Sequence, residues 1–546
     1  MININKFMSL LQQKKFNEAK SLINSQNFGI NESNKSALKG ILEFELKNYD
    51  KAIHYLKEAS FTFPKNFSHN FNLAIALGKN QQILKAIKQF RICINNNYKN
   101  EDSLLGITEL LIDKKKFNFS IKLLLNSKLF SEKIYYQISF IYNKIYLAQP
   151  AEKYVLLALD KNPKNINSLF LYAEILRKLG KNLKAIEIYN KILEIDPNLK
   201  ISLLSIANCY GEIEMYNESI KSYEKYLTHH PTSIDANYYY SQIKLKTGQF
   251  EDKIFLNFDN RFFISERATK QYYNINHKLW SGNYVDKLVV WSEQGIGDHL
   301  FFSKHLEEIS LKVKNLIFLT SPRLVNLFKN YFKNKPFINI QIDSLENKVK
   351  DFNAHLPAGS IMRIIKYNSQ QNFRKASRFL EPEQKDNAFF SKYINNKFLN
   401  VGLSWKSSNT KEIYRNINFE QIINTLNKNI KTQFYNLQFD LSSIEIEEAK
   451  KSNLIFFDNL DYKKDIDKVA SIIENLDVVI TVQNTIAHLS CALNKKTYLL
   501  LPLGSRWYWG SENVDQWYKV ATIFKQNKLF DWDEVLKLVN SQLKNE

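Results

Sequence analysis

Apolar residues recur every three or four positions through the first half of the chain, which is the spacing of one face of an α-helix. The segment from Asn167 to Pro197 shows this pattern on both sides of Gly180. Ala173 and Ala185 are small enough to let two such helices pack closely, and Pro197 would end the second. The segment is therefore predicted to be a helix–turn–helix unit, with apolar or small positions at Leu169, Tyr172, Ala173, Leu176, Ala185, Ile186, Tyr189 and Ile192.

The same unit recurs along the chain. Prolines follow one another at a spacing of 34 residues, at Pro163, Pro197 and Pro231. A small residue opens each predicted second helix at steps of 31 to 34 residues, at Ala19, Ala52, Ala86, Ser120, Ala151, Ala185 and Ser219. Small residues also occupy first helices, at Gly40, Ala74, Ala173 and Ala207. The period and the pattern resemble the tetratricopeptide repeat, and the resemblance covers residues 1–265 in about seven units.

This resemblance implies an α-solenoid whose concave surface holds an extended peptide or a partner protein. The alternative is that the array only supports or dimerises the rest of the chain, which would make the protein a homo-oligomer through its repeats. The tyrosine run at residues 238–240 fits either a groove lining or a core.

After about residue 285 the pattern changes to short β-branched and aromatic runs separated by helical stretches. Such alternation predicts parallel sheets with right-handed crossovers. A polar segment at residues 381–396 divides the alternation into two series. The predicted fold class is thus α plus α/β, with a repeat solenoid at 1–265 and Rossmann-like halves at 266–395 and 396–546. Strands are expected at residues 287–291, 315–320, 400–405, 433–438, 454–457, 477–482 and 497–501.

Composition narrows the function classes. The 546 residues are 44% hydrophobic and 14% aromatic, which excludes wholesale disorder. The net charge of +21 comes from lysines spread over the whole chain rather than from a dense basic block, so nucleic-acid binding is not expected. Cys93, Cys209 and Cys491 lie far apart without metal-ligand spacing and are interpreted as buried, inert thiols. The start does not read as a signal peptide and no run is long enough to span a membrane, so a cytoplasmic location is expected.

Three polar loops follow predicted strands, where parallel sheets bind their ligands. In the first, Gly295 and Gly297 let the backbone turn sharply and approach a ligand, and Asp298 opens a helix. Asp298 is either a catalytic carboxylate or an ordinary helix cap. The second loop, residues 405–409, offers Lys406 and hydroxyls, with Arg415 shortly after, and is either a phosphate site or a surface turn.

The third loop, residues 481–485, leads from a buried strand into a helix rich in small residues. Backbone N–H groups at the start of this helix, near Asn484 and Thr485, suit a diphosphate. His488 lies one turn further on, where it either reaches the same ligand or is structural.

Together and in this order, the three loops make the second half similar to glycosyltransferase family 9, the heptosyltransferase-like GT-B proteins. The resemblance rests on the 293–298 loop with its Gly-Asp pair, on residues 402–405 with Arg415 after them, and on the Asn484–Thr485 helix start with His488. The 505–509 cluster, which includes Arg506, completes it over about residues 250–545. Bacterial proteins in which tetratricopeptide repeats precede such a domain are more similar still, and O-linked N-acetylglucosamine transferase has a similar arrangement.

The resemblance implies an inverting, metal-independent transferase that uses a nucleotide-sugar as co-substrate and no other cofactor. In that family the Asp of the Gly-Asp pair, here Asp298, is the general base, which fits the need to take a proton from an acceptor hydroxyl. The position before Asn484 often carries Asp in the family, whereas this chain has Gln483. The donor-binding residues so implied are Gly295, Gly297, Ser404, Lys406, Arg415, Gln483, Asn484, Thr485, His488 and Arg506.

The sequence therefore favours a glycosyltransferase whose repeats recruit an acceptor protein or peptide. One alternative is a non-catalytic repeat scaffold with a degenerate transferase-like domain, for which the exchange at Gln483 is an argument. Another is a transferase that acts on a glycan or a lipid-linked sugar, in which case the repeats serve assembly.

Overall fold

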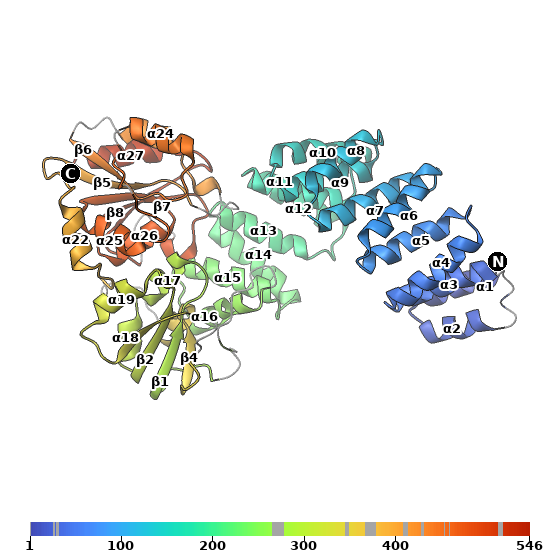
Figure 1. The fold of residues 1–546 in the computed structure, drawn as a ribbon, viewed down its shortest axis with the longest axis horizontal. Coiled ribbons are helices and arrows are strands. Elements are labelled where there is room, and N and C mark those ends of the chain that lie inside the picture. The colour runs from blue at the N-terminus through green and yellow to red at the C-terminus, as the bar shows by residue number, and fades with distance from the viewer. Residues whose placement is uncertain are drawn as a thin grey trace. The chain divides into compact units, whose positions relative to one another are not determined.

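The computed structural model describes residues 2–25, 28, 32–264, 273, 278–343, 349–365, 378–407, 413–426, 431–452, 454–457, 459–510 and 517–546. Ser408 and Asn409 of the second predicted loop lie outside the described residues. The chain divides into two compact units, Met1–Pro197 and Asn198–Glu546, and each is taken by itself below (Figure 1).

The first unit is built from helices that follow one another in hairpins, as the 34-residue period predicts. The small residues expected at the start of the second helices are all fully buried, from Ala19 to Ala185. Without a larger side chain at these positions, paired helices approach closely enough to share a core. The helices are α1 (Ile2–Gln12), α2 (Phe16–Asn24), α3 (Glu32–Glu45), α4 (Tyr49–Thr62), α5 (Phe67–Lys79), α6 (Ile83–Asn95), α7 (Asn100–Asp113), α8 (Phe117–Asn126), α9 (Glu132–Lys144), α10 (Ala148–Lys161), α11 (Ile166–Lys178) and α12 (Asn182–Ile195).

The second unit begins with the same motif. Helices α13 (Ile201–Glu212), α14 (Tyr216–His229), α15 (Ile234–Lys246) and α16 (Asp252–Asp259) are followed by the short helix η2 (Asn260–Phe262). The small residues predicted in the two helices of this unit are in contact, since the Ser219 hydroxyl donates to the Ala207 carbonyl at 2.8 Å. The repeat architecture thus continues into the unit that holds both sheets.

Two parallel sheets follow, as the alternating pattern predicts. The first has the strand order β3–β2–β1–β4 and the second β6–β5–β7–β8–β9, and each pairing is parallel. Residues 454–457, predicted as a strand, make only a parallel bridge between Ile455 and Tyr435. The strands are β1 (Val285–Trp291), β2 (Val313–Thr320), β3 (Ile338–Ile342), β4 (Ala354–Pro357), β5 (Leu399–Ser404), β6 (Thr432–Asn436), β7 (Val478–Val482), β8 (Thr497–Leu501) and β9 (Ala521–Lys525).

Helices cover the sheets and join them into one core. Helices α23 (Phe419–Leu426) and α27 (Asp533–Leu543) pack on one face of the second sheet. On its other face lie α25 (Ile466–Asn475) and α26 (Thr485–Ala492), in a core that also holds α17 (Ile296–Ser303), α19 (Val325–Phe332) and the first sheet. The same core includes Tyr238 and Leu245 of α15 and Phe258 of α16. The last repeat helices are therefore part of the sheet core.

A buried ion pair fixes the loop after β1 to this helical segment. The Arg261 guanidinium, 1% exposed, donates to both carboxylate oxygens of Glu293 at 2.6 and 2.7 Å. It also donates to Asp259 at 2.6 Å, and Glu293 accepts a third hydrogen bond from the Gly359 N–H at 2.9 Å. Such a two-pronged pair repays part of the cost of taking both charges out of water.

The described residues contain no helix long and apolar enough to cross a membrane. Cys93, Cys209 and Cys491 are buried and form no disulfide with one another, as predicted.

Removing one partner of the buried pair should destabilise the second unit selectively. We expect Glu293→Gln to lower the free energy of unfolding by about 3–5 kcal/mol, because Arg261 keeps its charge without its main counter-ion. All seven tryptophans lie between residues 280 and 532, so their fluorescence during urea unfolding reports on this unit. Glu383→Gln, which breaks the exposed pair with Lys385, should change the same value by less than about 0.5 kcal/mol. Equal effects of the two substitutions would contradict the role given to Glu293.

Candidate functional site

A cavity of about 340 Å³ opens in the second unit at the carboxyl ends of β1 and β7, the end at which parallel sheets bind ligands. All of the predicted site residues except Ser404 and Lys406 line it. The lining residues are Tyr238, Gln242, Phe258, Gln294, Gly295, Ile296, Gly297, Asp298, Phe302, Arg323, Ser407, Arg415, Phe439, Tyr462, Lys463, Ile466, Val469, Gln483, Asn484, Thr485, Ile486, His488, Leu489, Arg506, Trp507 and Tyr508.

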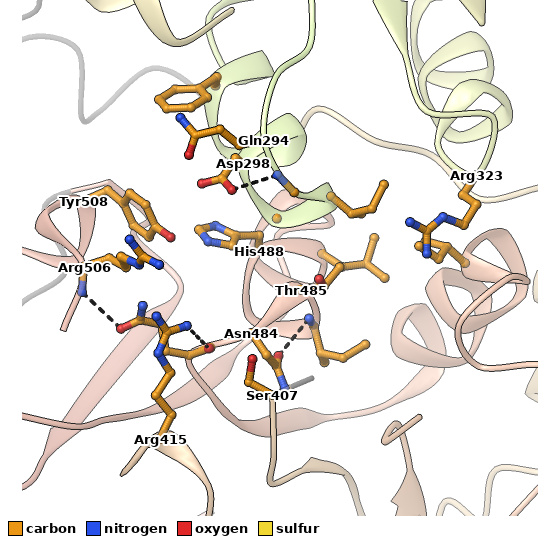
Figure 2. Close-up of a pocket in the computed structure, with 18 of the residues that line it drawn as sticks. Gln294, Asp298, Arg323, Ser407, Arg415, Asn484, Thr485, His488, Arg506 and Tyr508 are labelled. Carbon is orange, nitrogen blue, oxygen red and sulfur yellow. Dashed lines mark hydrogen bonds between the residues drawn. The ribbon is translucent and has the colours of Figure 1, made fainter. Parts of the chain in front are cut away.

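The first predicted loop turns sharply into α17. Gln294 has a positive φ of 65°, and Gly295 caps the helix with extended backbone. The Asp298 carboxylate accepts a hydrogen bond from the Gly295 N–H at 3.1 Å, which turns the side chain back toward the start of its own helix (Figure 2). Asp298 therefore caps its helix, one of the two interpretations that the sequence left open, and it also lines the cavity, while its catalytic role stays a prediction.

The second glycine of this loop permits the close approach of α17 to α26. A Cβ atom added at Gly297 would lie 3.0 Å from the His488 ring and 3.8 Å from the Thr485 Cα. The two helix starts, one from each sheet, therefore meet across this position.

Asn484 caps α26 with its side chain. Its Oδ1 accepts from the N–H groups of Ile486 at 2.9 Å and Ala487 at 3.3 Å, which satisfies two of the donors at this helix start. Its Nδ2 donates to Ser404 Oγ at 2.8 Å. Ser404 is thus buried between strands, where it holds the cap in place and does not face the cavity.

Lys406 is the other predicted residue that does not line the cavity, and it forms an ion pair outside it. Its ammonium group contacts both carboxylate oxygens of Glu445, at 2.6 and 2.7 Å. Glu445 belongs to α24 (Ser443–Lys451), and together with Ser442 it forms the capping box at the start of this helix. The cation predicted for a phosphate is therefore paired within the protein.

Gln483 connects two of the three arginines that line the cavity. Its Oε1 accepts from the Arg506 N–H at 3.2 Å, and its carbonyl accepts from the Arg415 guanidinium at 3.5 Å. The Gln483 side chain is 98% buried, and within the described residues its Nε2 has no hydrogen-bond partner. An unsatisfied buried donor in a cavity wall suits an acceptor atom of a ligand.

Asp298 and Arg506 lie close enough to influence each other's titration. Burial raises the pKa of the Asp298 carboxyl above its ordinary value, although Arg506, the Gly295 N–H and Arg415 oppose this shift. Figure 2 shows Asp298, Tyr508 and Arg506 on one side of the cavity and Arg323 on the other. A carboxylate with raised proton affinity thus lines the same cavity as a guanidinium that acts on it electrostatically.

His488 is neutral in this site. Its Nδ1 lies 3.2 Å from the Tyr518 hydroxyl, and its ring stacks on Trp509 with centroids 4.7 Å apart. Burial lowers its pKa to about 3. At neutral pH His488 therefore offers a hydrogen bond rather than a positive charge.

Some lining residues could not be selected from the sequence. Tyr238 and Gln242 come from α15, where groove and core residues share the same helical period. Arg323 follows β2, so its place after a strand was the available signal. Phe439, Tyr462 and Lys463 come from turns without a recognisable pattern. Within the described residues no group of three or more His, Cys, Asp or Glu side chains could hold a metal ion.

Comparison with known proteins identifies the repeats. A family model described as tetratricopeptide repeat matches residues 167–198. No curated protein matches the chain. Similar solved structures include the C-terminal part of a TPR repeat-containing protein from Cytophaga hutchinsonii, at 17% identity and a TM-score of 0.34, covering 42% of this chain and 97% of that one. A tetratricopeptide repeat protein from Parabacteroides merdae has 16% identity and a TM-score of 0.35, covering 42% and 91%. Pseudomonas aeruginosa pilF has 15% identity and a TM-score of 0.32, covering 38% and 96%.

The two glycines of the first loop should differ in their tolerance of a side chain. We expect Gly297→Ala to lower the free energy of unfolding by about 1–3 kcal/mol, because its Cβ meets the His488 ring at 3.0 Å. At Gly295 the nearest atom to a Cβ is Asp298 Oδ2 at 3.5 Å, an ordinary contact. Gly295→Ala should therefore stay within about 0.5 kcal/mol, since its weaker cap and its stiffer unfolded chain roughly offset each other. Urea unfolding followed by tryptophan fluorescence measures both, and the reverse order of effects would contradict this packing.

Burial of neutral His488 should make the second unit sensitive to acid. The folded pKa of about 3 lies below the ordinary 6.5, so the unfolded state binds more protons between these values and stability falls as the pH falls. From pH 7 to pH 5 this one histidine should cost about 2 kcal/mol. In His488→Gln the decrease in the free energy of unfolding from pH 7 to pH 5 should be smaller by that amount, as measured from urea unfolding at both pH values. Part of the slope should remain in the variant, because burial also lowers the pKa of His299, to about 4. An unchanged slope would mean that His488 does not titrate as described.

Proposed function

We propose that this protein is a glycosyltransferase that moves a sugar from a nucleotide-sugar donor to an acceptor hydroxyl. The observation that carries the proposal is the joint position of Asp298 and Arg506 in one cavity between two parallel sheets. The resemblance of the loops to the heptosyltransferase-like GT-B family supplies the reaction class. On this proposal the Rossmann-like halves are residues 266–395 and 396–546.

Asp298 takes the proton in this scheme. The acceptor oxygen attacks the anomeric carbon of the sugar, the bond from that carbon to the diphosphate oxygen breaks, and the acceptor proton passes to the Asp298 carboxylate. A raised pKa improves a carboxylate as a base, provided that it stays ionised at the working pH. The hydrogen bond from Gly295 holds the carboxylate in place for this step.

The leaving nucleoside diphosphate needs positive charge and hydrogen-bond donors. Arg506 and Arg415 supply charge that does not titrate, and the unsatisfied Nε2 of Gln483 lies between them. In this scheme the guanidinium groups neutralise the developing charge, as a divalent ion does in other transferases. Two N–H groups at the start of α26 are already bound by Asn484, so they contribute to the cap rather than to the ligand.

The repeats indicate which kind of acceptor the transferase would use. Tetratricopeptide repeats commonly bind peptides and proteins, and the family match at residues 167–198 lies in this part of the chain. We therefore propose a protein acceptor that the repeats recruit.

Replacing the proposed base should stop the chemistry and leave donor binding intact. A panel of UDP-, GDP-, ADP-, CMP- and dTDP-sugars, tested by thermal shift and calorimetry, should yield a binder. With that donor, Asp298→Asn should lower release of the nucleotide by about 10²–10⁴-fold, while Kd changes less than about threefold. Asn keeps an oxygen that can accept from the Gly295 N–H, so the helix cap survives.

Asp286→Asn is the matched control, because Asp286 is an exposed carboxylate on β1. It should leave both the donor Kd and the release rate unchanged. Full activity of Asp298→Asn would remove this residue from the mechanism. The absence of any binder in the panel would contradict the proposed function as a whole.

A further inference from the structure

Helix α15 presents three polar residues at intervals of four. Tyr238, Gln242 and Lys246 follow one another at this spacing, which places them along one face of the helix. Tyr238 and Gln242 line the cavity. Lys246, at the end of the same face, is 3% exposed and does not line it. The last complete hairpin of the repeat array therefore reaches the site with one helix face.

Lys246 is bound to the loop that carries Arg506. Its ammonium group donates to the Ser505 hydroxyl at 2.7 Å, to the Ser505 carbonyl at 2.5 Å and to the Arg506 carbonyl at 3.4 Å. These partners are 259 and 260 residues away in sequence. One side chain of the repeats thus holds consecutive backbone groups of the site loop.

The turn between α13 and α14 holds the other side of the same loop. The Gly504 N–H donates to the Glu214 carboxylate at 3.3 Å, and Glu214 also pairs with Lys525 of β9. Gly504 has a φ of +67°, and a Cβ there would lie 3.0 Å from the Glu212 carbonyl oxygen. The loop is therefore packed against repeat backbone at a position that only glycine fits without strain.

Burial of Lys246 is costly, and its hydrogen bonds explain its presence. A lysine ammonium is almost never fully buried unless its donors are satisfied. Its neighbour Leu245 packs into the apolar core and stabilises this end of the helix. Lys246 is therefore not needed for that packing. Three acceptors from one loop are a specific requirement that an apolar side chain could not meet.

We propose that Lys246 is a positioning residue that sets the place of Arg506, so that the repeat array completes the diphosphate-binding site. The inference rests on the proposed function, because Arg506 is taken there to bind the nucleoside diphosphate. From Lys246 the connection runs through Ser505 to the Arg506 backbone, whose N–H donates to Gln483 Oε1 at 3.2 Å. Arg506 and Gln483, two of the three groups assigned to the diphosphate, are thus fixed through one loop.

A double-mutant cycle tests this proposal on the full-length chain. Calorimetry with the nucleoside diphosphate of the donor found in the panel gives Kd for the wild type, Lys246→Met, Arg506→Ala and the double variant. We expect Lys246→Met to raise Kd by about 10-fold or more, because it removes the hydrogen bonds that hold the loop. In the Arg506→Ala background the same substitution should change Kd by less than about twofold, since its effect passes through Arg506. Equal effects in both backgrounds would overturn the proposal.

Two further variants separate positioning from general damage to the fold. Lys253→Met, at an exposed lysine on α16, should leave Kd unchanged. Ser505→Ala removes one acceptor of Lys246 from the loop side and should raise Kd in the same direction by a smaller factor. Should Lys246→Met fail to fold, Ser505→Ala takes its place in the cycle with Arg506→Ala.

Hydrogen exchange tests the same connection without any ligand. Amides of residues 503–510 should exchange at least about 10-fold faster in Lys246→Met than in the wild type or in Lys253→Met. Unchanged exchange there would overturn the positioning role even if nucleotides bind. A wild type that binds no nucleotide, but shows the faster exchange in Lys246→Met, would overturn the proposed function and leave the positioning role supported.

Discussion

The buried pair between Arg261 and Glu293 is the interaction on which the site depends. It joins the helical segment at η2 to the loop after β1, and through the Gly359 N–H it also reaches the segment after β4. Two charges taken out of water are worth their cost only when their geometry is good and their remaining hydrogen-bonding capacity is met. Here both carboxylate oxygens are used, so the loop has little freedom. Asp298 follows Glu293 by five residues, so this anchor holds the chain close to it.

A second anchor acts on another loop of the cavity wall. Lys246 and Glu214 hold the loop that leads to Arg506, much as Arg261 holds the loop that leads to Asp298. Both anchors come from the helical part of the second unit, whereas Arg506 comes from a loop beside the second sheet and Asp298 from the first turn of α17, just after a loop. Loops alone place side chains loosely, and a site gains precision when rigid elements support it. The division of the chain after Pro197 fits this arrangement, because it leaves α13–α16 with the sheets that they support.

The sequence predicted the parts of the fold that have a period. Ala19 and its counterparts are fully buried because a helix hairpin allows no larger residue there, and strands alternating with helices gave parallel sheets. The cavity could be predicted from the loops, because the alternating pattern also shows where each strand ends and parallel sheets bind ligands at that end. Lys406 shows where this reasoning stops: a cation after a strand suggests a phosphate, yet Glu445, 39 residues away, binds it. Tyr238 and Gln242 could not be chosen either, because a helix buries core and cavity residues at the same spacing. Pairings between distant segments leave no local pattern.

The ionisable groups of the cavity respond differently to their burial. Asp298 is the only carboxylate among the described lining residues, and burial raises its pKa above the ordinary value. His488 stays neutral because its pKa is about 3, and guanidinium groups remain protonated in proteins. Affinity for an anionic ligand should therefore change little with pH on the side of Arg415 and Arg506, whereas the proton-accepting step should follow Asp298. If the proposed function holds, the donor stays bound across the pH range in which Asp298 becomes ionised, so that binding and chemistry are controlled by different groups.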